Sequence, residues 1–62
     1  MKYLIITLYD LSDKEIVIST ITLDTLEEAK TIYNNIDSIA HGFKVSLCEE
    51  GQRSIVELER KG

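Results

Sequence analysis

Apolar side chains alternate with other residues along the first part of the chain. In segment 2–9, apolar residues occupy every second position from Leu4 to Leu8, with β-branched and aromatic residues between them. This pattern predicts a strand over 2–9. Turn-forming side chains follow over 10–14, and segment 15–23 again has β composition without helical spacing. The two strands are therefore predicted to form a hairpin.

A helix is predicted over 26–40, directly after the second strand. Thr25 and Glu28 have the spacing of a capping box, in which the Thr25 hydroxyl accepts the Glu28 amide and the glutamate carboxylate reaches back to the Thr25 amide. Gly42 is the expected C-cap, and the pair Asn34–Asn35 is the point where the helix could end a turn or more early. Apolar residues recur at helical spacing: Leu26, Ala29, Ile32, Tyr33, Ile36 and Ile39.

The last third of the chain predicts a second hairpin. Its strands are expected over 43–48 and 53–59, joined by a turn over 49–52 in which Gly51 supplies a positive φ. The first hairpin overlays the second without a gap, so a duplicated ββ unit and convergent patterning are both open interpretations. The elements together predict one α+β domain over 1–62, of the order ββαββ, since 62 residues hold a single small core. The expected sheet is four-stranded and antiparallel in type, with the helix packed on one face, and the pattern leaves the strand order open.

One helix covers one face of such a sheet, yet apolar residues occupy both faces of the predicted strands. The residues expected to face the helix are Leu4, Ile6, Leu8, Val17, Ile21, Leu23, Val45, Leu47, Val56 and Leu58. The residues expected on the opposite face are Tyr3, Ile5, Tyr9, Ile16, Ile18, Cys48 and Ile55. A contiguous apolar patch of this kind on a small protein predicts an interface, most simply that of a homodimer.

Charge and cysteine content narrow the partners and the compartment. Seven Lys and Arg against eleven Asp and Glu give a net charge of −4, which disfavours direct binding to nucleic acid or anionic lipid. One cysteine forms no internal disulfide, and no apolar run is long enough to span a membrane, so a cytoplasmic location is expected. The acids could instead form an array that imitates nucleic-acid phosphates: Asp10, Asp13, Glu15, Glu49, Glu50, Glu57 and Glu59.

The chain offers little for catalysis. His41 is the only imidazole and Cys48 the only thiol, and they fall on different predicted elements. The acidic pairs Glu27–Glu28 and Glu49–Glu50 lack the histidine or further acids that a metal site needs, and no glycine-rich phosphate loop is present. The sequence therefore predicts no catalytic, cofactor or metal site, and a protein that is not an enzyme. The alternative from another class is a small enzyme or ligand-binding domain that uses His41 or Cys48.

The succession of a hairpin, LDTLEEAKTIYNNI, GFKVSLCEEG and a final strand resembles small cytosolic proteins encoded by bacteriophages of Gram-positive bacteria. That group includes anti-defence proteins, which bind and block host immune complexes. The resemblance spans nearly the whole chain, rests on caps and turns, and carries no site residue over. It implies a protein–protein interaction module that inhibits a host defence complex by occupying its surface. A small regulatory or ligand-binding domain and an acidic nucleic-acid mimic are the alternative functions.

Overall fold

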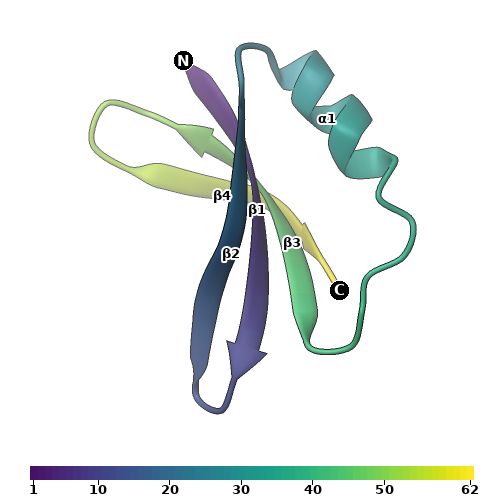
Figure 1. The fold of residues 1–62 in the computed structure, drawn as a ribbon. Coiled ribbons are helices and arrows are strands. Elements are labelled where there is room, and N and C mark those ends of the chain that lie inside the picture. The colour runs from purple at the N-terminus through teal and green to yellow at the C-terminus, as the bar shows by residue number, and fades with distance from the viewer.

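The computed structural model describes residues 1–62 as a twisted four-stranded sheet with one helix beside it (Figure 1). The elements are β1 (Lys2–Leu11), β2 (Lys14–Leu23), α1 (Leu26–Asn34), β3 (Phe43–Glu50) and β4 (Ile55–Lys61). All neighbouring strands are antiparallel, in the order β2-β1-β3-β4. The predicted α+β, ββαββ fold is confirmed. The order leaves β1 and β3 in the centre of the sheet and makes β2 and β4 its two edges.

The helix begins where the capping box predicts. The Glu28 amide donates to Thr25 Oγ1 at 3.2 Å, and Thr25 has the extended backbone of an N-cap residue. The second half of the box differs from the prediction, because the Thr25 hydroxyl itself donates to Glu28 Oε1 at 3.0 Å. The cap and its carboxylate therefore stabilise the first turn through one shared hydroxyl.

The helix ends at Asn34, so the predicted end at residue 40 is wrong and the early end named at Asn34–Asn35 is confirmed. Asn35 is the C-cap, and its amide donates to the carbonyls of Thr31 and Ile32. The last turn contains no basic residue, and Lys61 of β4 donates from Nζ to the carbonyls of Tyr33 and Ile36 at 2.6 and 2.9 Å. Asparagine has a low helix propensity, and the last turn of α1 is stabilised by the charge of a lysine from a distant strand.

Gly42 is not the C-cap of α1 but the residue that leads into β3. Its φ of +88° lies in the left-handed region, and a Cβ placed there would lie 3.0 Å from the Tyr9 ring. Glycine is therefore needed for both its backbone and the close approach of Tyr9. Gly51, in contrast, has no positive φ, so its predicted role in the second turn is wrong.

The two hairpins have different loops. Leu11 pairs directly with Lys14, whereas Glu50 pairs with Ile55 across a four-residue loop closed by the Gly51 amide and the Ser54 carbonyl at 2.8 Å. The gapless overlay of the two hairpins therefore equates positions that differ in their pairing.

The main core lies between the helix and the centre of the sheet. Ile5, Ala29, Tyr33, Val45 and Leu47 form the buried cluster, with Tyr3, Leu23, Ile32, Ile36 and Ile39 packed against it. Ile36 and Ile39 contribute from the loop after the helix, so their predicted core role survives although the helix does not reach them.

The predicted facing of β1 is wrong. Ile5 pairs with Ile21 and Leu47 and lies in the helix-side cluster, so the odd-numbered positions of β1 face the helix and Leu4, Ile6 and Leu8 face away. Alternation along a strand separates two sides without saying which one is inner. A register shift between Thr7 and Leu8 then reverses the alternation in β2. Val17 therefore pairs with Leu8 and faces away from the helix, contrary to the prediction.

Candidate interaction surface

The seven residues expected to form an interface do not share one face of the sheet. Tyr3 and Ile5 lie on the helix side, and Ile5 is only 1% exposed. Tyr9 follows on the same side of β1, where its ring lies against Phe43 with the centroids 4.8 Å apart. The expectation that these three residues lie opposite the helix is wrong, because the alternation of β1 had been assigned to the wrong side.

The other four predicted residues divide by their strand. Cys48 faces away from the helix in the central strand β3, where it pairs with Leu4 and is buried. Ile16, Ile18 and Ile55 are exposed, and all three lie on edge strands. Ile16 pairs with Tyr9 and lies on the helix side, so its predicted place on the opposite face is also wrong. Exposure therefore follows the position of a strand in the sheet more closely than the face of the sheet.

Exposed apolar side chains gather on β2 and β4. Apart from Met1 and Leu11, the large exposed apolar residues are Ile16, Val17, Ile18 and Ile21 of β2 with Ile55, Val56 and Leu58 of β4. Sequence reasoning missed this grouping because the strand order was open. The one feature that sets β2 apart in the sequence is the uncharged eight-residue segment 16–23. Edge strands usually carry charges, so this segment alone is typical of an inner strand.

The face opposite the helix is covered at its centre by side chains from both edges. Arg60 of β4 donates from Nη1 to Glu15 Oε2 of β2 at 2.6 Å, and from Nε to Glu57 Oε2 at 3.0 Å. The Ser46 hydroxyl donates to the same Glu57 oxygen at 2.8 Å and contacts Cys48 Sγ at 3.3 Å. Ser46 is 1% exposed beneath this network. The twisted sheet thus buries the middle of its second face without a second helix.

The network also changes the ionisation of its members. The hydrogen bonds that Ser46 and Arg60 donate hold the pKa of the Glu57 carboxyl below its ordinary value. Hydrogen bonds to Glu15 and Glu57 raise the pKa of the Arg60 guanidinium. The pairing also interrupts the proposed acidic array, because Asp10 lies 3.4 Å from Lys44 while Glu15 and Glu57 contact Arg60. Three of the seven carboxylates of the predicted array are therefore paired with basic side chains.

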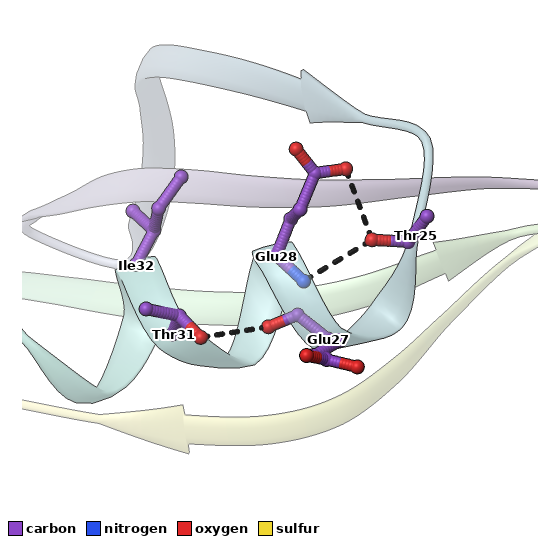
Figure 2. Close-up of a pocket in the computed structure, with 5 residues that line it drawn as sticks. All are labelled: Thr25, Glu27, Glu28, Thr31 and Ile32. Atoms are coloured by element: carbon purple, nitrogen blue, oxygen red, sulfur yellow. Dashed lines mark hydrogen bonds between the residues drawn. The ribbon is translucent and has the colours of Figure 1, made fainter.

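A hollow beside the first turn of α1 is lined by Thr25, Glu27, Glu28, Thr31 and Ile32 (Figure 2). The polar groups in this hollow bind one another: besides the cap, the Thr31 hydroxyl donates to the Glu27 carbonyl at 2.9 Å. Two carboxylates at a helix N-terminus stabilise its dipole and repel an incoming anion. The polar groups that line this hollow therefore serve to cap the helix.

His41 and Cys48 are held apart. Cys48 is buried within β3, whereas His41 is exposed in the turn before it and lines an open hollow with Tyr9 and Gly42. The extended chain from Phe43 to Cys48 covers five steps of about 3.3 Å, or about 17 Å. A cysteine–histidine nucleophile pair is therefore not formed. No group of three or more His, Cys, Asp and Glu side chains is arranged to hold a metal ion.

No helix is long and apolar enough to cross a membrane. No protein-family model, curated protein or solved structure matches the chain.

Proposed function

We propose that this protein is an interaction module that binds other protein chains through its two edge strands. The supporting observation is that seven large, exposed apolar side chains lie on β2 and β4. Exposed edge strands present both apolar side chains and free backbone N–H and C=O groups. An extended segment of a partner adds to such an edge as a further strand.

Within this proposal, the protein is a phage-encoded inhibitor that acts in the host cytoplasm by occupying the surface of a defence complex. The resemblance of the chain to small phage proteins supports this assignment. The net charge of −4 supports a protein partner over direct contact with nucleic acid.

The test uses bacterial strains that each carry one defence system and restrict a sensitive phage. The protein is expressed with a purification tag, and phage plating efficiency and co-purified proteins are measured together. We expect the wild type to restore plating in one strain and to co-purify stoichiometrically with a component of that system.

Charges on the edges then separate this mode of action from others. Val17→Lys on β2 and Val56→Lys on β4 change side chains that are 57% and 52% exposed. At least one of them should abolish both plating and co-purification, because the added charge is desolvated in the complex. Lys30→Ala on the exposed side of α1 is the matched control and should act as the wild type. Full activity of both edge variants would contradict the proposal, as would a wild type that has no effect in any strain.

A further inference from the structure

The free backbone groups of β2 can be identified from the pairing of β1. The Asp10 amide donates to the Gly42 carbonyl on the β3 side, and antiparallel strands turn alternate residues to alternate neighbours. The even-numbered residues of β1 therefore bond to β3 and the odd-numbered ones to β2. The β2 residues opposite the even-numbered positions turn their N–H and C=O groups outward: Glu15, Val17, Thr20 and Thr22.

This set of free groups is complementary to itself. When β2 is paired antiparallel with another β2 so that Val17 faces Thr20, Glu15 faces Thr22 as well, and all four residues form hydrogen-bonded pairs. The bulge at Ile18 makes Val17 and Thr20, two successive outward-facing positions, three residues apart instead of two. In the antiparallel pair, the three-residue spacing of one copy lies directly opposite that of the other copy. The bulge that breaks the alternation of β2 against β1 therefore preserves the register of β2 against itself.

Side chains agree with this register. Ile16 of one copy faces Ile21 of the other on the helix side, in a non-hydrogen-bonded pair where side chains approach most closely. These residues are 39% and 44% exposed in the single chain. The only charges of β2, on Lys14 and Glu15, lie at one end of the strand and face Leu23 and Thr22 of the other copy. Parallel pairing in register would instead place Lys14 beside Lys14.

We propose that the β2 edge binds the β2 edge of a second copy of this chain, antiparallel about a two-fold axis, to form one continuous sheet. The inference deepens the proposed function, because it assigns an occupant to one of the two edges and leaves the β4 edges at the two ends of the dimer for other partners. β4 fits this second role better than self-pairing, because its outward backbone positions include Glu57 and Arg60. The Arg60 side chain is already engaged with both Glu57 and Glu15.

The first test measures molar mass by light scattering across a concentration series. The wild type should approach twice the 7.1 kDa of one chain as concentration rises. Ile16→Lys should return the mass to that of one chain, because the lysine would face Ile21 in the dimer. Val56→Lys on β4 is the matched control and should leave the dimer intact. Circular dichroism identifies variants that have unfolded.

The second test fixes the register and does not depend on a variant that weakens assembly. In the proposed dimer a cysteine at position 16 faces one at position 21 of the other copy, within the reach of a disulfide. Within one chain the two positions are about 17 Å apart along the strand, too far to bridge. Diamide should therefore convert the double variant Ile16→Cys, Ile21→Cys almost completely to a covalent dimer.

Each single cysteine variant should form no covalent dimer under the same oxidation, and a mixture of the two should cross-link. A wild type that keeps the mass of one chain at all concentrations would overturn the inference. Cross-linking of either single variant alone would overturn the register. Both results leave the plating experiment unaffected, so failure of this inference is distinguishable from failure of the proposed function.

Discussion

The two edges of this sheet have a similar apolar content and differ in how charge is placed on them. β2 has no charged residue from Ile16 to Leu23, whereas β4 carries Glu57, Glu59, Arg60 and Lys61 within seven residues. Charged side chains on an edge strand oppose pairing with another chain, because they must be desolvated there. β4 is thus protected by its charges from pairing with another chain, and β2 is not.

The charges of β4 also hold the rest of the molecule. Arg60 reaches Glu15 across the face opposite the helix, and Lys61 bonds to carbonyls at the end of α1 while lying 4.3 Å from the centre of the Tyr33 ring. β2 contacts the helix at its C-terminal end, where Leu23 packs against the core cluster and the chain leads into the cap at Thr25. β4 therefore connects the helix and the sheet through its charged side chains, whereas the surface of β2 is free for binding.

Truncation to alanine should first separate the centre of the sheet from both edges. Leu47→Ala removes a side chain with 0% exposure from the core, and should lower the free energy of unfolding by about 2–5 kcal/mol. This loss is a large part of the stability of so small a domain. Val17→Ala and Val56→Ala should each cost under about 0.5 kcal/mol in the isolated chain, as exposed sites do. Urea unfolding at low protein concentration makes the comparison, and an edge variant as damaging as Leu47→Ala would contradict it.

The structural role of β4 should appear next. Lys61→Met keeps the aliphatic stem and removes two charged hydrogen bonds to the end of the helix, and should cost about 1–3 kcal/mol. Lys14→Met, an exposed lysine at the start of β2, is the control and should change the unfolding midpoint little. Equal effects of the two substitutions would remove the distinction between the edges.

The connection between β2 and the helix should have a smaller effect. Thr25→Ala removes the hydroxyl that accepts the Glu28 amide, and should cost about 0.5–2 kcal/mol. Thr25→Ser keeps the hydroxyl and should restore most of the loss. Thermal unfolding followed at a helical wavelength tests both variants, and an unchanged melting temperature for Thr25→Ala would show that another residue caps the helix.

The smallest expected effect is a dependence on pH that belongs to the β4 side. The folded-state pKa of Glu57 lies below its ordinary value of 4.5, so the unfolded chain binds a proton more readily there. Its contribution to stability is therefore present above pH 4.5 and is lost as pH falls through the lowered pKa. Glu57→Gln should flatten this part of the stability profile. Acid unfolding curves that are the same for wild type and Glu57→Gln would contradict the assignment.

Local patterns were sufficient for the elements of this protein and for the start of its helix. Alternation over 2–9, β composition over 15–23 and the turn of the second hairpin predicted the four strands to within about two residues. The pair Thr25 and Glu28 predicted the helix start, since a cap acts within one turn.

Features that depend on distant contacts were decided by the tertiary structure. The end of α1 at Asn34 is supported by Lys61, which lies 27 residues later in the sequence and whose approach no local pattern records. The facing of β1 required knowing which side the helix covers, and the facing of β2 required the bulge opposite Thr7 and Leu8.

The sequence by itself determined that four strands and one helix form, because secondary structure depends on side-chain spacing within a few residues. The tertiary structure alone decided that β2 is an edge, because strand order is fixed by the packing of whole elements. An uncharged run such as 16–23 suits a buried inner strand and an exposed binding strand equally well. The strand order is what turns the same residues from core into a surface for binding.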